Sequence, residues 1–398
     1  MDNISMNTRL GGNLVSKRLF FLTLLLIVVL NFSIVGFAKD DLDIEAKTAI
    51  LIDYHTGRVL FEKNPHKKAY PASISKIMTL LLAMEALENE RINLSDEVRI
   101  SAHAAGMGGS QLWLEEGEVQ TVEDLLKAIC LRSANDASVA LAEHIAGSEE
   151  AFVKAMNERA RELNMKNTNF VNATGLPHKD HYVSAYDVGL MSIELLKYEK
   201  IHNWLTTYMD EMSVGKKKDK VQSLVNTNRL VKEYKGITGI KTGSTAEAGF
   251  CLSASAKKGN MQLIAVVMGC ETSKIRFEEG IKLLDYGFAN YDSITIGQKG
   301  DAIGKVDVYK GDVEEIEAVL ERDSYILLSK GMERDLEKEI VLPSHVYGPM
   351  EQGEEIGYMI IKVDGKEMDR VNLVSKVGIG KANWKGMFKK AFKSFLAS

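Results

Sequence analysis

Cysteine is scarce in this chain, and its scarcity excludes a fold that depends on disulfide bonds. Three cysteines occur in 398 residues, an odd number that provides no framework of pairs. Cys130, Cys251 and Cys270 stand in apolar contexts, so we expect them to be small buried hydrophobic residues. A chain of this length is able to bury a substantial core, and its length suggests two or three domains.

The chain also lacks an excess of positive charge, an internal repeat and a low-complexity tract. Its formal net charge of −5 gives no reason to expect a nucleic acid as a partner. Hydrophobic residues make up 45% and charged residues 26%, which are ordinary shares for a soluble globular protein. The composition therefore favours an ordinary soluble globular protein.

The first 38 residues are typical of an export signal. Lys17 and Arg18 precede the apolar run 19–30, and Gly36 and Ala38 stand where a signal peptidase reads small residues. We expect 1–38 to be a signal peptide. The alternative is an uncleaved N-terminal anchor, and either reading takes the rest of the chain out of the cytoplasm.

Strand patterns on both sides of a helical middle predict the fold of residues 39–290. Residues 47–62 are typical of a β-hairpin, and strands are expected at 249–256 and 262–269. Helical patterns fill the middle and follow the last strand, at 73–87, 122–131, 137–146, 151–163, 185–198 and 276–290. This order predicts an α/β (α+β) domain with a helical subdomain and one antiparallel sheet assembled from both ends.

Beyond this domain the pattern changes twice. Short strands that alternate with turns predict a small all-β domain over 293–376. The segment 381–398 then contains five lysines and no acidic residue. On a helix, three lysines would lie opposite the face that carries the aromatic residues. These aromatic residues are Trp384, Phe388, Phe392 and Phe395. We expect a basic amphipathic helix that lies in an anionic membrane interface; the alternative is a helix docked on its own protein.

The first motif with chemical content is the pair Ser73 and Lys76. Three residues apart at the start of a predicted helix, the two side chains lie one turn apart on the same face. A serine hydroxyl needs a base to become a good nucleophile, and a lysine with a lowered pKa is able to act as that base. Alone, the pair is a weak signal, because such pairs are common on helix surfaces.

Two further motifs strengthen the indication of serine chemistry given by Ser73 and Lys76. Ser133 and Asn135 stand between two predicted helices, where a loop presents a hydroxyl and an amide to a cleft. Lys241 and Thr242 follow a strand-like segment, and the glycine after them, Gly243, lets a substrate backbone approach the strand edge closely.

Together and in this order, Ser-x-x-Lys, Ser-x-Asn and Lys-Thr-Gly resemble the active-site signature of penicillin-binding proteins and serine β-lactamases. The flanking residues narrow the resemblance to low-molecular-mass penicillin-binding proteins of the D-alanyl-D-alanine carboxypeptidase type. Residues 167–170 and 174–177 are also similar to that family, and the close resemblance covers about 44–290. It implies a β-lactamase/transpeptidase-like catalytic domain, peptidoglycan stem peptides as substrates, and β-lactam antibiotics as inhibitors.

The resemblance also implies a role for each motif residue. Ser73 would attack the carbonyl between the two terminal D-alanines and form an acyl-enzyme, and Lys76 would take its proton. Ser133 would relay a proton to the leaving amine. Asn135 would hold Lys76 and a substrate amide.

The third motif would recognise the end of the substrate. Lys241 and Thr242 would bind its terminal carboxylate, next to Gly243. The backbone N–H groups of Ser73 and Ser244 would form the oxyanion hole. Some relatives carry histidine where this chain has Ser244, which changes the side chain at that position but not the backbone donor.

Other readings remain open or are disfavoured. A class A β-lactamase would need a glutamate where this chain has Ala160, so that reading is rejected. An endopeptidase that cuts wall cross-links shares all the motifs, and a non-catalytic penicillin-binding scaffold is the alternative from another class. His178 and His181 have no second cluster of ligands, so we expect no metal and no cofactor. Asp136 is expected to be a helix cap.

Overall fold

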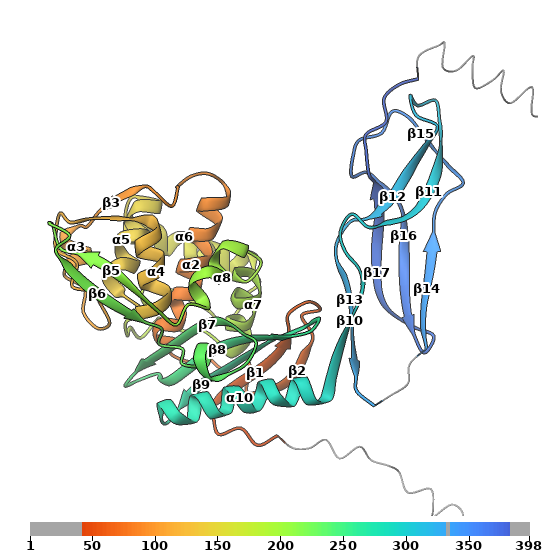
Figure 1. Ribbon diagram of the computed structural model, residues 1–398. Helices are drawn as coiled ribbons and strands as arrows, with labels where there is room; N and C mark the ends of the chain where they lie inside the picture. Colours follow the sequence, from red (N-terminus) through yellow and green to blue (C-terminus); the bar gives the residue numbers. More distant parts are fainter. Residues whose placement is uncertain (1–41, 332–334, 383–398) are drawn as a thin grey trace, which may run out of the picture. The chain divides into compact units, whose positions relative to one another are not determined.

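The computed structural model describes residues 42–331 and 335–382 (Figure 1). The expected signal peptide, 1–38, lies outside the described residues, as does the expected amphipathic helix apart from its first two positions. Within the described ranges, no helix has both the length and the apolar character needed to cross a membrane.

A five-stranded antiparallel sheet organises the first part of the chain. Its strand order is β2-β1-β9-β8-β7, so the N-terminal hairpin pairs with strands from far along the sequence. The strands are β1 (Thr48–Asp53), β2 (Val59–Lys63), β7 (Ile237–Thr245), β8 (Gly249–Lys258) and β9 (Met261–Cys270). The prediction of one antiparallel sheet assembled from both ends is confirmed, and β7 is one of its two edges.

Helices cover both faces of this sheet. A Cβ placed on Gly189 of α7 (Ala185–Leu195) would lie 2.4 Å from Ile52 Cδ1, and one on Gly287 of α10 (Ser273–Asn290) would lie 3.0 Å from Leu51 Cδ2. Neighbouring residues of a strand face opposite sides of a sheet, so these two helices lie on opposite faces. All six residues of β1 are accordingly buried, and Figure 1 shows α10 along one face.

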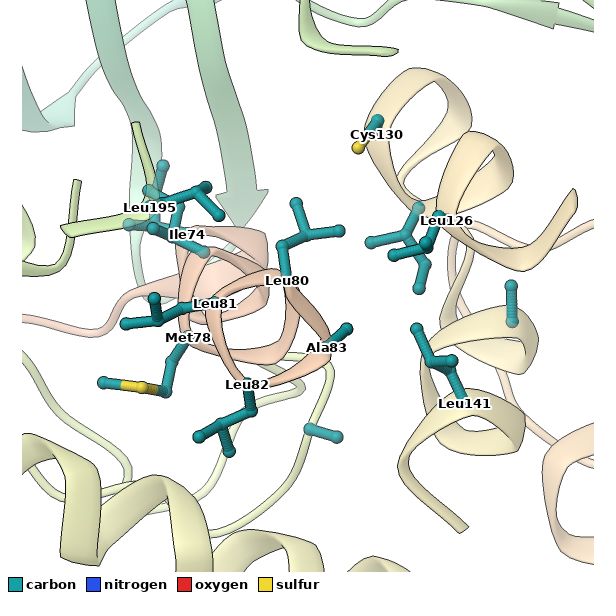
Figure 2. Packing of buried hydrophobic residues seen from close by; sticks show 14 of the residues in the cluster. Ile74, Met78, Leu80, Leu81, Leu82, Ala83, Leu126, Cys130, Leu141 and Leu195 are labelled. Atoms are coloured by element: carbon teal, nitrogen blue, oxygen red, sulfur yellow. The ribbon is translucent and has the colours of Figure 1, made fainter. Parts of the chain in front are cut away.

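The helical part is built around α2 (Lys76–Glu88), which follows the short 3₁₀ turn η1 (Ala72–Ser75). Most of α2 is buried on every side, as expected of a helix that is apolar all round. In Figure 2, Leu80 and Ala83 face Leu126 and Leu141 of neighbouring helices. Each fully buried leucine contributes about 1.5–3 kcal/mol, so α2 is a rigid base for the residues at its start.

The remaining elements surround α2 and complete this part of the chain. The helices are α3 (Ala102–Ala105), α4 (Val122–Arg132), α5 (Asn135–Ala146), α6 (Glu149–Glu162), α8 (Glu199–Leu205) and α9 (Leu230–Glu233). Two small antiparallel pairs join them: β3 (Glu97–Arg99) with β4 (Val119–Thr121), and β5 (Met209–Val214) with β6 (Lys220–Val225).

The short elements α3, α8, α9 and the β3–β4 pair were not predicted, and two further differences have a clear physical reason. The β5–β6 hairpin was not predicted, because its strands carry many charged and polar residues and show no clear alternation. Helix α10 begins at Ser273, three residues before the expected start, because the Thr272 side chain accepts a hydrogen bond from Ile275 N and caps the helix there.

The C-terminal part is all-β, as predicted. The pair β10 (Tyr291–Gly297) and β13 (Ser324–Ser329) accompanies a six-stranded sheet in the order β14-β16-β17-β12-β11-β15. These strands are β11 (Ala302–Tyr309), β12 (Glu315–Leu320), β14 (Leu336–Val341), β15 (His345–Tyr347), β16 (Glu355–Val363) and β17 (Lys366–Ser375). The turn between β16 and β17 has positive φ at Asp364 and Gly365, which suits a tight hairpin.

Candidate active site

The centre of the site is the turn that joins η1 to α2. Ser73 is partly exposed, whereas Ile74, Ser75 and Lys76 are buried. Lys76 Nζ lies 3.1 Å from Ser73 Oγ, so the predicted pairing of the two side chains is present in the structure. Ser73 is therefore the residue of this turn, 73–76, that is not buried.

Lys76 has two further hydrogen-bond partners, which come from distant parts of the sequence. Its Nζ donates to Asn135 Oδ1 at 2.6 Å and to the carbonyl oxygen of Thr174 at 2.7 Å. The Lys76 side chain has no exposed surface. Burial, and then the positive charge of Lys241, hold the pKa of Lys76 well below its ordinary value, while Asp136 opposes the shift.

The second motif supplies a hydroxyl and an amide beside this pair. Ser133 ends α4 with φ 61°, and its buried Oγ has no hydrogen-bond partner among the described residues. Asn135 begins α5, and its Nδ2 donates to the carbonyl oxygen of Gly108 at 2.6 Å. A buried hydroxyl without a partner is rare in native structures, so Ser133 Oγ has hydrogen-bonding capacity that the described residues leave unused.

The third motif lies on edge strand β7, directly beside the turn. A Cβ placed on Gly243 would lie 3.0 Å from the backbone nitrogen of Ser73, so a larger residue would push the strand away from the turn. Thr242 Oγ1 donates to Thr227 Oγ1 at 2.8 Å. Ser244 is the next residue of β7 and is exposed. The strand therefore presents its edge to the space in front of Ser73.

Lys241 is a second buried lysine of this site. Its Nζ donates to the Thr242 carbonyl oxygen at 3.1 Å, and its side chain is 1% exposed. Burial lowers the pKa of Lys241 to about 7, a shift that the nearby Arg276 charge increases and Cys130 opposes. A lysine poised in this range is able to hold or release its proton near neutral pH.

Several supporting residues were not assigned to the site from the sequence. Gly175 has φ 86°, and a Cβ there would lie 1.8 Å from the Ala72 carbonyl oxygen, so only glycine lets this loop contact the turn that carries Ser73. Arg276 Nη1 donates to the Gly243 carbonyl oxygen at 3.1 Å and supports β7. The segment 174–177, Thr-Gly-Leu-Pro, was noted in the sequence as similar to the family, but its contact with the turn that carries Ser73 was not predicted.

Asp136 corrects the expectation of a helix cap. The N-cap of α5 is Ala134, and Asp136 lies within the first turn. Its Oδ2 accepts hydrogen bonds from the backbone nitrogens of Leu112 at 2.9 Å and Leu114 at 3.1 Å, so it holds a separate loop. Burial raises the pKa of this carboxyl against the effect of those donors.

His181 is buried and supports the turn that carries Ser73. Its Nε2 lies 2.8 Å from Ser75 Oγ, and its ring meets the edge of Phe170. Burial lowers the pKa of His181 to about 4, so the ring is neutral near pH 7. Its hydrogen bond joins the loop around Gly175 to the turn between Ser73 and Lys76.

Comparisons with known proteins agree with this geometry. Residues 35–272 match the family model described as D-alanyl-D-alanine carboxypeptidase, and residues 291–381 match the one described as penicillin-binding protein 5, C-terminal domain. The chain is 46% identical over 375 residues to D-alanyl-D-alanine carboxypeptidase DacF of Bacillus subtilis, which covers 92% of this chain and 96% of that protein.

Solved structures give the same result. Penicillin-binding protein 5 from Haemophilus influenzae has a TM-score of 0.71 and 32% identity, over 85% of this chain and 98% of that chain. Penicillin-binding protein D2 from Listeria monocytogenes, in its ampicillin-bound form, has a TM-score of 0.55 and 29% identity, over 62% of this chain and 98% of that chain.

The fold and the three motifs thus define a serine enzyme of the low-molecular-mass penicillin-binding protein class. More narrowly, the chain belongs to the D-alanyl-D-alanine carboxypeptidase family. It is a serine-type D-Ala-D-Ala carboxypeptidase, which confirms the function that the sequence predicted.

Proposed function

We propose that Ser73 is the nucleophile of this carboxypeptidase and that Lys76 is its base. The supporting observation is the set of three oxygen atoms around Lys76 Nζ, from Ser73, Asn135 and Thr174. A neutral amine has two N–H bonds and one lone pair. Donation to Asn135 Oδ1 and to the Thr174 carbonyl leaves the lone pair for the Ser73 hydroxyl, and the lowered pKa of Lys76 favours that neutral form.

The reaction then follows from the positions of these groups. Ser73 Oγ attacks the carbonyl carbon between the two terminal D-alanines while its proton passes to Lys76. The resulting oxyanion accepts hydrogen bonds from the backbone N–H groups of Ser73 and Ser244. Ser133 Oγ relays a proton to the leaving amine, free D-alanine departs, and water hydrolyses the ester to restore Ser73.

Substrate recognition falls to residues on both sides of Ser73. Asn135 Nδ2 is available to an amide on the acyl side of the bond, next to its contact with the Gly108 carbonyl. Lys241 and Thr242 bind the terminal carboxylate, which suits a cation and a hydroxyl donor. Substrates that end in D-Ala-D-Ala and fit this arrangement are the stem peptides of peptidoglycan.

A β-lactam should acylate the same residue and remain bound. The relative from Listeria monocytogenes, solved with ampicillin bound, supports this, and Ala160 lies inside α6, where it provides no carboxylate to activate a deacylating water. After penicillin treatment, intact-mass and peptide-mapping measurements should show one long-lived adduct, on Ser73. An adduct that persists in Ser73→Ala, or rapid steady hydrolysis of a chromogenic β-lactam, would contradict this assignment.

An endopeptidase activity on wall cross-links remains the second candidate with the same motifs, and a non-catalytic scaffold is disfavoured by the family match. Product analysis separates the candidates. Incubation with a pentapeptide should release one equivalent of free D-alanine, whereas incubation with a cross-linked dimer should leave the cross-link intact if carboxypeptidase activity dominates.

We also propose that the enzyme is exported and held at an anionic membrane surface. The supporting patterns are the signal-like segment 1–38 and the basic amphipathic pattern of 381–398. Deletion of 383–398 should abolish binding to anionic vesicles while D-alanine release persists, and salt should weaken binding of the full chain. Vesicle binding that is unchanged by the deletion would place the anchor elsewhere.

A further inference from the structure

Trp113 is an exposed aromatic residue beside the active site. Its side chain is 61% exposed, although tryptophan is usually well buried in folded proteins. Its φ is 55°, in the left-handed region that bulky residues rarely adopt. An exposed tryptophan in an unfavourable backbone conformation needs support from its surroundings, and such strain is concentrated at functional sites.

The surroundings of Trp113 do provide that support. Its two neighbours are buried, Leu112 at 1% and Leu114 at 2% exposure, so the chain is anchored on both sides of the indole. Their backbone nitrogens both donate to Asp136 Oδ2. The single buried carboxylate therefore holds the turn in the conformation that points Trp113 away from the core.

The same loop is joined to the catalytic residues. Asn135, which accepts a hydrogen bond from Lys76, also donates its backbone N–H to the Ser110 carbonyl at 2.7 Å and its Nδ2 to the Gly108 carbonyl at 2.6 Å. Residues 108–114 are thus fixed through Asn135 and Asp136, at consecutive positions of α5.

The polar edge of the indole is satisfied inside the loop. The Gln111 side-chain amide has one orientation in which both its oxygen and its nitrogen form hydrogen bonds. In that orientation Trp113 Nε1 donates to Gln111 Oε1 at 3.1 Å, and the Gln111 amide nitrogen donates to the Met107 carbonyl oxygen. This contact restrains the ring through its edge. The rest of the side chain is largely exposed, so a ligand is able to stack against the ring.

We propose that Trp113 is a binding residue for the acyl side of the substrate, where it packs against the stem peptide upstream of the D-alanyl-D-alanine end. This inference rests on the proposed function, because it uses Asn135 as the contact for the amide on that side of the scissile bond. The loop is hydrogen-bonded to Asn135 at Gly108 and Ser110, and the exposed indole of Trp113 follows three residues after Ser110. A peptide extended upstream from this amide therefore meets the indole beyond the reacting groups.

The test compares two substrates that both end in Lys-D-Ala-D-Ala: a blocked tripeptide and a pentapeptide. The ratio of their kcat/KM values, pentapeptide over tripeptide, measures the contribution of the upstream residues. Trp113→Ala should lower this ratio about fivefold to tenfold, mainly through KM, whereas Trp113→Phe should keep it within about threefold. Met209→Ala is the matched control, because Met209 is 55% exposed on β5 and outside this loop.

A second variant separates binding from support of the fold. Glycine adopts positive φ without strain, so Trp113→Gly should melt at the same temperature as the wild type or higher, and should still lower the ratio. A purely structural role predicts the opposite: lower stability and equal losses on both substrates. That result, or an unchanged ratio in Trp113→Ala, would overturn the inference.

The failure of this inference is distinguishable from failure of the proposed mechanism. All variants are also labelled with a β-lactam and mapped. Absence of label on Ser73 in the wild type would refute the proposed mechanism, whereas normal labelling with an unchanged substrate ratio would refute only the role of Trp113. A loss that appears only when a disaccharide is added to the pentapeptide would move the contact from peptide to sugar and overturn the peptide assignment.

Discussion

Replacement of Lys76 by glutamine should slow acylation of Ser73 about 10²- to 10⁴-fold, the usual contribution of a positioned general base. Glutamine is able to retain hydrogen bonds to Asn135 and to the Thr174 carbonyl, but its amide nitrogen has no basic lone pair to receive the serine proton. The variant therefore removes the base and keeps most of the polar contacts. The rate constant for β-lactam acylation, followed by stopped-flow fluorescence, gives the measurement directly.

The stability of the same variant provides an independent check. In the folded protein Lys76 has no exposed surface and a strongly lowered pKa, so near pH 7 folding opposes its charged form. Glutamine carries no such cost, and the unfolding temperature of Lys76→Gln at pH 7 should equal or exceed that of the wild type. A slow and well-folded variant would show that the lysine is retained for chemistry.

The matched control is Ser75→Ala, in the same buried turn. It removes the contact with His181 Nε2 and leaves the pair Ser73 and Lys76 in place. We expect less than a tenfold loss in acylation from this change, because no proton acceptor is lost. Equal losses in the two variants would mean that any disturbance of the turn is sufficient, and Lys76 would then lose its assignment as the base.

The sequence predicted the local parts of this site well. Short-range patterns placed the loop between α4 and α5, and they placed a helix over 73–87, of which 73–75 are a 3₁₀ turn and α2 begins at Lys76. They indicated a strand-like segment only before Lys241, whereas β7 continues through Lys241 to Thr245. Such patterns depend on residues within one or two turns, which is why they are readable in one chain. The family resemblance then linked the three motifs.

The contacts that unite the motifs were not predictable. Thr174 contributes a backbone carbonyl to Lys76 across 98 positions, and any residue has such a carbonyl, so its side chain gives no signal. Asp136 looked like a cap because its position near a helix start suits that role, yet its carboxylate holds the neighbouring loop. The left-handed conformation of Ser133 at the C-cap of α4 was not predicted either, because a non-glycine residue rarely adopts it.

The site contains two buried lysines, Lys76 and Lys241, with different proposed roles. Burial lowers the pKa of both, and the charge of Lys241 further lowers that of Lys76. The proposed roles require opposite states, since the base must be neutral and the partner of a carboxylate must be charged. An incoming carboxylate stabilises the charged form of Lys241, so substrate binding would favour the required state at that position.

A pH profile should therefore depend on whether the substrate carries its terminal charge. Lys241 has a pKa of about 7 in the free enzyme, so its charged form predominates below that pH and is lost as the pH rises. For a peptide with a free carboxylate, kcat/KM should fall on the alkaline side of about pH 7. For the peptide amide, which has no charge to recognise, that descending limb should be absent.

Removal of either partner should cost about tenfold to a hundredfold in kcat/KM at a pH where Lys241 is charged. This range corresponds to roughly 1.5–3 kcal/mol for a hydrogen bond to a charged group. Lys241→Gln should show this loss on the free acid and little further loss on the amide, because both changes remove one interaction. Lys257→Gln, which removes the same charge from an exposed position on β8, should leave both substrates nearly unaffected. If Lys241→Gln instead causes the same loss on both substrates, the two penalties add in full. Lys241 is then not the partner of the carboxylate, and its effect would be assigned to proton transfer.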